Sequence, residues 1–533
     1  MENYFCSKCD EWRVISGSIA NIKRHVDFHT KEEEDEKNHH ILSLNSGIES
    51  ERDYAFKFIS KQIRKFFLLN GYPFSVIEDE FLRAVCPNMP SREEFSRQVE
   101  VIAKKTETAI MECIGRYNFI SIAFDEWTDL LKRRFVGIVA QAVNGGSMNM
   151  FILGLTPIKT ISATGEHIAQ IILSTLEKYG IQKIVKTGVT DSGSNMISAF
   201  DYLPFQRYPC ACHTINLMIN AFMKASNNHI DPIVYLAKSL SSSKFQQYLE
   251  NTKANRKTVP TFISIRWYSF FQVLEALDIL KQSITNYCNI DKSIIIVQGI
   301  WDNITVLFPL FTCLKYVIEK LEKDKFGTIS YFVTGMLSIK KHIISLPTRF
   351  NSGIEAYKEK EQAIWYKYQN CWSPILFSAT RLNPTLDINS ILSPEDIIKG
   401  DDLILSMMGA FRDNSIEITE NHKGNDLDPF SFFKTNLAQD SDFMAFQNYK
   451  TESYPEIEDL LSFWNKKLGT PQDHLAKVAL EILSSLITSS SAEREFSQAR
   501  RSLGFQRFRL SKEHVEDINI IMGNPRISTE FIN

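Results

Sequence analysis

The stretch Phe119–Asp129, FISIAFDEWTD, decides the fold that we expect for this chain. Its first six residues are apolar or small, and the run then ends on an acid, Asp125. A short β-prone run of this kind indicates a buried strand with the carboxylate at its end. An acid in that position is costly unless a cation or a hydrogen-bond donor meets it. We therefore expect the chain to bring companions to Asp125.

A second buried strand with the same ending is predicted at 184–190 (IVKTGVT), and Asp191 follows it directly. Between the two runs, the residue pattern predicts strands at 134–143 and 148–156 and a helix at 164–179. The order β-β-β-α-β, with acids ending the first and fourth strands, is that of an RNase H-like core. The expected fold class is therefore α/β.

Asp125 and Asp191 would lie at the ends of adjacent strands, where two carboxylates can share a divalent metal. Asp191 also has a plainer interpretation as a turn residue or helix cap, because the polar run SGSN follows it at 192–195. Its pairing with Asp125 favours the metal.

Length and composition set broad limits on the function. The 533 residues exceed a single core, so roughly two to four domains are expected. The net charge of −3 excludes a globally basic surface, and any DNA contact must come from local basic faces. We expect no signal peptide, and no apolar run reaches the length of a membrane span. Nine cysteines in such a chain favour a reducing compartment.

The N-terminal segment has the ligand spacing of a zinc finger. Cys6 and Cys9 precede His25 and His29 in a C-x2-C-x15-H-x3-H pattern. Two thiolates and two imidazoles one helical turn apart complete a tetrahedral Zn²⁺ site. The alternative is two accidental cysteines and two surface histidines. The pattern resembles a BED-type or C2H2 finger with a long middle spacer. Arg13, Lys23 and Arg24 add a basic face that suits contacts to phosphate.

Two later segments carry further polar candidates. Cys210 and His213 suggest a second zinc site at first sight, but no second ligand pair has the right spacing. We expect for them a structural role or a place beside the active site. Glu493 lies near the start of a predicted helix that Ser490 or Ser491 can cap. The tail that follows is the most basic part of the chain, and its aromatic residues suit a partner interface or a DNA-facing element.

Five segments, in order along the chain, resemble the hAT family of cut-and-paste DNA transposases. They are FDEWTD from Phe124, VTDSGSNM from Val189, CACHTINL from Cys210, IRWYS from Ile265 and SSSAEREFSQARRSLGFQRFRLS from Ser489. The last resembles the family's C-terminal dimerisation motif. The resemblance runs from about Tyr54 to the C-terminus, and the N-terminal finger fits the family's BED position.

The resemblance implies an Asp-Asp-Glu triad made of Asp125, Asp191 and Glu493. Three carboxylates about two Mg²⁺ (or Mn²⁺) ions would activate water or a 3′-hydroxyl for an in-line displacement, without a protein nucleophile. The nearest competitor of Glu493 is Glu495, which lies two residues on and about 200° around a helix. Only one of the two can therefore face the metals.

The resemblance assigns two further elements. The family's Cys-x-x-His falls on Cys210 and His213, beside the active site. Its base-stacking tryptophan falls on Trp267, with Arg266 beside it as a DNA contact, and the alternative for Trp267 is a buried core indole. The sequence departs from the family where IRW replaces the usual TRW and where Cys212 lies inside the Cys-x-x-His.

The resemblance also implies a domain order, in which a large all-α insertion interrupts the RNase H-like core. The expected boundaries are a zinc finger at 1–30, an acidic linker at 31–50, a helical DNA-binding or dimerisation domain at 51–116, the first part of the core at 117–226, the insertion at 227–470, and the end of the core with the dimerisation region at 471–533. We expect the tail from Ala492 to Ile521 to pack against the insertion and a second subunit. Alternatively, its aromatic residues complete the core of a single chain.

The implied function is that of a nuclear DNA transposase. It would bind transposon ends and a target as double-stranded DNA, cleave with hairpin formation, and transfer the strands. It would act as a homodimer or larger homo-oligomer, without a membrane. One alternative is a domesticated, transposase-derived transcriptional regulator that binds DNA without cleaving it, against which the intact triad argues. The other is a stand-alone RNase H-like nuclease, which would not need the finger or the C-terminal interface.

Overall fold

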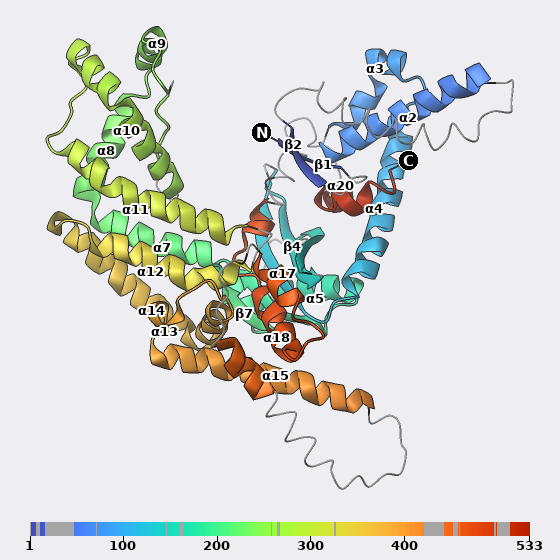
Figure 1. Ribbon diagram of the computed structural model, residues 1–533. Helices are drawn as coiled ribbons and strands as arrows, with labels where there is room; N and C mark the ends of the chain where they lie inside the picture. The colour runs from blue at the N-terminus through green and yellow to red at the C-terminus, as the bar shows by residue number, and fades with distance from the viewer. Residues whose placement is uncertain are drawn as a thin grey trace, which may run out of the picture. The chain divides into compact units, whose positions relative to one another are not determined.

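The computed structural model contains two compact units, one made of Met1–Ile110 with Gln498–Asn533 and the other of Met111–Ser497. Most elements are helices, and the larger unit also contains a five-stranded sheet (Figure 1). The residues that the structure describes are 2–6, 11–15, 47–70, 72–129, 131–144, 146–158, 164–256, 258–263, 267–323, 327–419, 442–450, 457, 459–494, 497 and 512–532.

The sheet of the larger unit has the strand order β5-β4-β3-β6-β7. β3 pairs antiparallel with β4, which pairs antiparallel with β5, whereas β6 and β7 run parallel to β3. The strands are β3 (Ile120–Thr128), β4 (Arg134–Asn144), β5 (Ser147–Pro157), β6 (Val185–Thr190) and β7 (Gln206–Pro209). The four strands and the helix expected between 119 and 190 are confirmed, and β7 is an addition.

β3 differs from the expectation in its length, because it continues beyond Asp125 to Thr128. Past Asp125 it pairs with β4 alone, and Trp127 lies opposite Phe135 with ring centroids 5.5 Å apart. Aromatic pairs of this kind stabilise neighbouring antiparallel strands. Asp125 is therefore not the last residue of its strand; it lies where the parallel partner β6 has ended.

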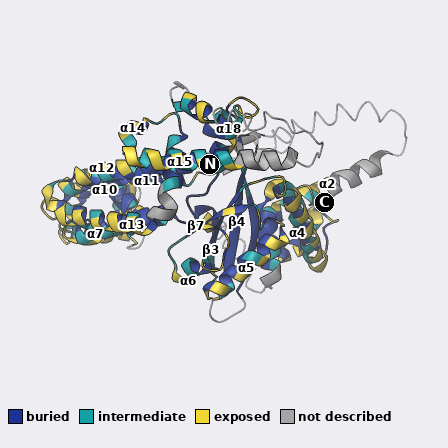
Figure 2. Ribbon diagram, turned by 90° about the horizontal axis from the view of Figure 1, so that it is seen from below, coloured by how far each residue is buried: buried dark blue, intermediate teal, exposed yellow. Residues whose placement is uncertain are grey.

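One face of the sheet is covered by α5 (Gly165–Lys178) and α6 (Ser194–Ala199). Phe124 points to this side and stacks on Phe200, which follows α6, with ring centroids 5.3 Å apart. Gly188 in β6 leaves room for that ring, because a Cβ there would lie 3.0 Å from Phe200. Figure 2 shows the central strands buried between their covering layers.

The other face of the sheet accepts a segment from much later in the chain. The hydroxyl of Ser121 accepts a hydrogen bond from the backbone N–H of Leu486 at 2.9 Å. The side-chain amide of Gln141, which lies opposite Ser121 on β4, donates to the carbonyl oxygen of Ser484 at 2.9 Å. Both contacts are buried, so two polar side chains of the sheet fix the backbone that leads to Glu493.

The helices from α7 to α18 share one hydrophobic core, which reaches Ala123 and Val189 in the sheet. A large helical region is thus present as expected, and its long helix α13 packs against α7, α12, α15 and β7. The helices are α7 (Ala211–Ala225), α8 (Asn227–Ser239), α9 (Ser243–Asn251), α10 (Trp267–Ile290), α11 (Ile300–Leu321), α12 (Phe332–Ile344), α13 (Asn351–Arg381), α14 (Ile388–Ile391), α15 (Pro394–Thr419), α17 (Leu460–Asn465) and α18 (Asp473–Leu483).

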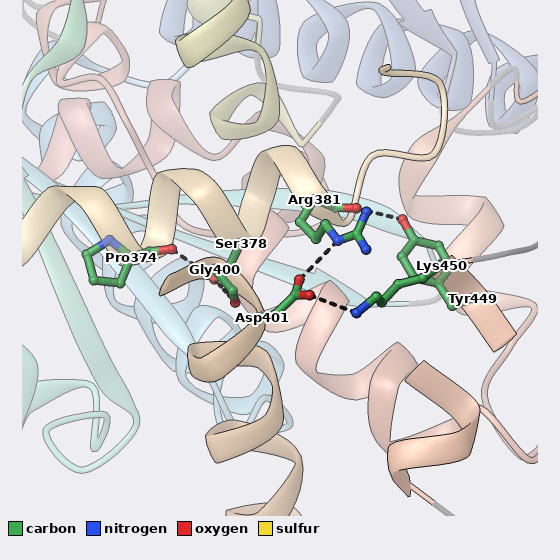
Figure 3. Close-up of polar contacts among 7 residues, drawn as sticks. All are labelled: Pro374, Ser378, Arg381, Gly400, Asp401, Tyr449 and Lys450. Carbon is green, nitrogen blue, oxygen red and sulfur yellow. Dashed lines mark hydrogen bonds and ion pairs between the residues drawn. The ribbon is translucent and has the colours of Figure 1, made fainter. Parts of the chain in front are cut away.

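A polar network ties the end of α13 to α15 (Figure 3). The carboxylate of Asp401 pairs with Arg381 Nε at 3.0 Å and with Lys450 Nζ at 3.0 Å. The phenol of Tyr449 donates to the backbone carbonyl of Arg381 at 2.9 Å. Because each oxygen of Asp401 has its own cation, the charge buried between the helices is compensated.

The smaller unit joins the two ends of the chain. Its core combines helices from the N-terminal third with α20, which contributes Ile518, Ile521 and Met522. His514 of α20 also bonds to Ser96 of α4, with Nε2 and Oγ 2.6 Å apart. The elements are β1 (Glu2–Cys6), β2 (Glu11–Ile15), α2 (Gly47–Leu69), α3 (Glu80–Val85), α4 (Arg92–Ile114), α20 (Lys512–Gly523) and α21 (Pro525–Ser528).

The tail expected to pack on the insertion therefore has two described destinations. Arg494 donates to the carbonyl oxygen of Glu322, at the end of α11, at 3.1 Å. Further on, α20 packs with α2 in the smaller unit. Within the residues that the structure describes, no helix is both long and apolar enough to span a bilayer.

Gly165, at the start of α5, tests how closely α5 packs on α6. A Cβ at Gly165 would lie 2.6 Å from the carbonyl carbon of Ser198 and 2.7 Å from the nitrogen of Ala199. We expect Gly165→Ala to lower the free energy of unfolding by about 1–3 kcal/mol through overpacking, measured by denaturant unfolding. The control is Gly409→Ala in α15, where a Cβ meets nothing within 4 Å and should add about 0.5–1 kcal/mol. An undiminished stability of Gly165→Ala would contradict the close packing of α5 on α6.

Candidate functional site

Asp125 and Asp191 follow the parallel pair β3 and β6 in the same register. The last paired residues are Ala123 and Val189, and each acid lies two positions further along. Since side chains alternate between faces, both acids belong to the face of Ala123 and Val189. Gly137 lies opposite Asp125 on β4 and carries no side chain, which leaves this part of the face open.

Each of the two carboxylates is held by one backbone donor. Oδ1 of Asp125 accepts from the N–H of Glu126 at 2.8 Å, and Oδ1 of Asp191 accepts from the N–H of Gly193 at 2.9 Å. The second bond is the turn contact expected of Asp191 in its plainer role, and it leaves the other oxygen available. Among the described residues, Oδ2 of each acid has no hydrogen-bond partner.

The neighbouring acid Glu126 is already committed to a cation. Its carboxylate receives both forks of the Arg134 guanidinium, with Oε2 and Nη2 2.7 Å apart. The arrangement is bidentate, which is the strongest form of such a pair. Glu126 thus contributes little net charge to the site, and Asp125 is the acid of this strand that remains unpaired by a cation.

Glu493 reaches the site at the end of the segment that docks on the sheet. After Leu486 the backbone bonds to α7, where Ala211 N donates to Ile487 O at 2.8 Å. Ser489 N then donates to the sulfur of Cys210 at 3.4 Å, and a helical turn at 490–494 begins. Glu493 lies on the exposed side of that turn.

The next contact anchors the same turn from its buried side. Ala492 packs in a small cluster with Val139 of β4 and Ile152 of β5. These two residues are cross-strand neighbours on the face that also carries Ala123. One side of the turn is therefore fixed on the sheet, and Glu493 lies on its exposed side.

The electrostatics of Asp125 show that the three acids are near one another. The pKa of Asp125 is raised from 3.8 to about 7. Burial of the carboxyl is the largest cause, the negative charge of Asp191 follows, and Glu493 and Glu126 add smaller contributions. The hydrogen bond from Glu126 N–H opposes the rise but does not cancel it. The structure thus brings Asp125, Asp191 and Glu493, which are far apart in the sequence, into one negatively charged region.

The chemistry of these donors fits a hard divalent cation. As the side chains lie, no group of three His, Cys, Asp or Glu among the described residues is arranged to hold a metal ion. Mg²⁺, however, is usually bound by one or two carboxylates together with waters and substrate phosphates. Asp125 and Asp191 each offer a carboxylate oxygen on the same face, so this pair fits Mg²⁺ or Mn²⁺.

Cys210 and His213 lie at the start of α7, beside the segment that carries Glu493. Burial raises the pKa of the Cys210 thiol, and its sulfur accepts backbone hydrogen bonds from Ser489 and His213. Burial also raises the pKa of Cys212 well above its ordinary value. Cys210 thus serves as a neutral anchor for the C-terminal segment in this structure.

Trp267 is the first residue of α10, and its side chain is only 7% exposed. It lies in the helical core, with its ring edge-on to Tyr268 and centroids 5.7 Å apart. This burial agrees with the alternative in which Trp267 is a buried indole of the core. The base-stacking role therefore stays a prediction that requires Trp267 to become accessible.

Most of the predicted zinc-finger residues, together with Arg266 and Glu495, lie outside the described residues. Cys6 is an exception, because it is described as the last residue of β1, where it pairs with Glu11 of β2. The others are Cys9, Lys23, Arg24, His25, His29, Arg266 and Glu495.

Two functional contacts were missed by sequence reasoning. Ser121 is a polar residue inside the apolar run FISIAF, and that interruption was a visible signal of its docking role. Arg207 precedes the Cys-x-x-His segment, and its Nη2 donates to the carbonyl oxygen of Asp191 at 2.8 Å. Nothing in the local sequence shows that Arg207 reaches back to Asp191.

Comparison with known families gives one match. Residues 436–524 match the family model of the hAT family C-terminal dimerisation region. In the described structure, this range includes α17, α18, the turn with Glu493, and α20. The match supports membership of the hAT family and homo-oligomerisation, and it suggests a transposase-like protein. No curated protein matches the chain.

The raised pKa of Asp125 predicts a stability change in metal-free protein. Because the folded-state pKa of about 7 lies above the ordinary 3.8, the ionised carboxylate destabilises the fold above about pH 7, and this cost fades as the pH falls toward 4. In chelator at about pH 8, we expect Asp125→Asn to raise the unfolding free energy by on the order of 2–4 kcal/mol. The gain should shrink near pH 5. Thermal unfolding of Asp125→Asn and of the exposed control Asp201→Asn measures it; equal effects would contradict the assignment.

Proposed function

We propose that this chain is a cut-and-paste DNA transposase of the hAT type, with Asp125, Asp191 and Glu493 as the acids of its active site. The observation that carries the proposal is the convergence of these three carboxylates. Asp125 in β3 and Asp191 after β6 each lie two positions beyond the last parallel pair of these strands, and Glu493 comes from the docked C-terminal segment. Clustered like charges with a raised pKa are common at catalytic sites.

The topology of the sheet supports the RNase H-like core in this proposal. The strand order β5-β4-β3-β6-β7 has the first strand of the core at its centre, with antiparallel partners on one side and parallel partners on the other. The helical region from α8 to α15 then separates β7 from α18, as an insertion would. The antiparallel pair β1–β2, whose first strand ends at Cys6, is compatible with the strands of a ββα zinc finger.

The chemistry proposed for the site needs no protein nucleophile. Bound Mg²⁺ (or Mn²⁺) would neutralise phosphate charge and increase the acidity of an attacking hydroxyl. Asp125 and Asp191 would bind the cation where the parallel pairing of β3 and β6 ends. Each would use the oxygen that its backbone donor leaves available. Glu493 would approach from the exposed side of its helical turn, which is the side that a DNA backbone can reach.

The wider proposal follows from the family. The chain would bind transposon ends and target DNA in the nucleus as a homodimer or larger homo-oligomer, and would form hairpins during excision. Trp267 and Arg266 would support the flipped base, because stacking on an indole contributes roughly 1–3 kcal/mol. The second candidate is a domesticated DNA-binding regulator that has kept the triad without using it.

Cleavage of DNA that bears the element's own ends tests the active site. We expect Mg²⁺-dependent strand cleavage by the wild type, and a loss of at least about a hundredfold in Asp125→Ala, Asp191→Ala and Glu493→Ala, because each removes a metal-binding carboxylate. Binding to the ends should persist in all three. Asp201→Ala, which removes an exposed acid outside the site, should cleave as the wild type does.

The outcomes separate the two candidate functions. End binding without cleavage in any divalent cation would favour the regulator. Cleavage by Asp125→Ala at a rate near that of the wild type would contradict the residue assignment even if the chain is a transposase.

The N-terminal finger gives an independent test. We expect one Zn²⁺ per chain by elemental analysis, lost when Cys6 and Cys9 are both replaced by Ser. The same variant should bind the ends more weakly and with a flatter salt dependence, because contacts to phosphate are lost. Unchanged binding together with an absence of zinc in the wild type would rule the finger out.

A further inference from the structure

Arg207 connects three parts of the larger unit at the edge of the site. It lies in β7, beside Gly188 of β6. Its Nη2 donates to the backbone carbonyl oxygen of Asp191 at 2.8 Å, at the residue where the chain leaves β6. Its guanidinium carbon lies 6.0 Å from the ring centroid of Phe200, which itself stacks on Phe124. Arg207 therefore holds Asp191 against the sheet.

The opposite side of the guanidinium faces the helical insertion. The guanidinium carbon lies 5.7 Å from the ring centroid of Tyr368, a buried residue of α13. Burial alone would raise the pKa of the Tyr368 phenol, but the side-chain hydrogen bond and positive charge of Arg207, together with Lys367, lower it below the ordinary value. Tyr368 and Arg207 are thus joined by a cation–π contact and a polar contact.

The position of Arg207 is unusual for a residue that serves only packing. Its Nε is buried and has no hydrogen-bond partner among the described residues, although an arginine on an open surface would bond to water. The unsatisfied Nε costs free energy, while Nη2 bonds to the carbonyl oxygen of Asp191. A planar guanidinium can stack between two aromatic rings and donate at its edge at the same time, which the ammonium of lysine cannot do.

We propose that Arg207 is a positioning residue, held by Tyr368 of α13, that sets the carboxylate of Asp191 for binding a divalent cation. The inference rests on the proposed function, and it adds a route by which the insertion controls the metal site. Groups that orient a metal-binding carboxylate typically change metal affinity by about 10–100-fold when they are removed.

A physical path leads from α13 to the site. A shift of α13 moves Tyr368, which moves the guanidinium and with it the backbone carbonyl of Asp191. The carboxylate of Asp191 is also tied to its own loop through Gly193 N–H, so it follows the backbone of that loop. Since α13 also packs against α12 and α15, movements of the insertion have a direct mechanical connection to one ligand.

Two measurements on the full chain test the inference. The first is the Mg²⁺ or Mn²⁺ concentration that gives half of the maximal thermal stabilisation, which needs no DNA and no catalysis. The second is the Mg²⁺ concentration that gives half-maximal cleavage. We expect Arg207→Lys to raise both concentrations by about tenfold and to recover much of its cleavage rate at saturating Mg²⁺.

Tyr368→Leu in α13 tests the connection to the insertion. It should raise the same two concentrations, and the double variant Arg207→Lys/Tyr368→Leu should be no worse than the stronger single one, because both act on one contact. Tyr368→Phe keeps the ring and loses the hydroxyl, so its effect should be in the same direction and smaller. If Arg207→Lys does not fold, these two variants decide the question.

Arg381→Lys is the matched control, because Arg381 also lies in α13 and is half-buried in an ion pair, with Asp401 (Figure 3). It should lower stability without moving either half-saturation concentration. A half-saturation concentration of Arg207→Lys within about twofold of the wild-type value would overturn the inference while leaving the transposase assignment intact. If the wild type shows neither stabilisation by divalent cations nor cleavage, both the inference and the transposase assignment are contradicted.

Discussion

The structure depends on docking the segment 484–492 onto one face of the sheet. Ser121 and Ala123 leave space for a backbone to lie directly on β3, and Gln141 and Ser121 supply the polar partners that this backbone needs. Burying a peptide group without such partners would cost about 1–3 kcal/mol for each group. Because the docked segment also carries Glu493, the same contacts close the fold and complete the cluster of acids. Packing and function are therefore joined in one element.

Because the contacts that close the fold also hold the acids in place, the fold tolerates like charges close to one another. Burial of the Asp125 carboxyl is the largest cause of its raised pKa, and repulsion from Asp191 adds to it. Selection for stability alone would replace one of the two acids or pair it with a cation. Glu126 has such a cation in Arg134. The uncompensated pair is what a divalent cation requires, and loading the cation would turn the repulsion into attraction.

Local patterns were sufficient to predict β3, β4, β5 and β6 and to single out Asp125 and Asp191, whereas β7 was not predicted and Glu493 was assigned from the family resemblance. An apolar run that stops at Asp125, and another that stops before Asp191, correspond to the central parallel strands β3 and β6. The sequence could not give the extension of β3 to Thr128, which rests on cross-strand pairing with β4. Nor could it give the contact from Arg207 to Asp191, because that contact depends on how β7 and α13 pack. Long-range contacts of this kind have no signature in a single sequence.

The distance along the chain between Asp191 and Glu493 has a consequence for biosynthesis. About 300 residues must be translated after Asp191 before the docked segment exists, which takes roughly 15–60 s at 5–20 residues per second. During that time the sheet face around Ser121 and Ala123 is not covered by the segment 484–492, and Glu493 has not been synthesised. A nascent chain is thus unable to assemble the complete acid cluster. The late position of Glu493 delays assembly of the site until about 300 further residues have followed Asp191.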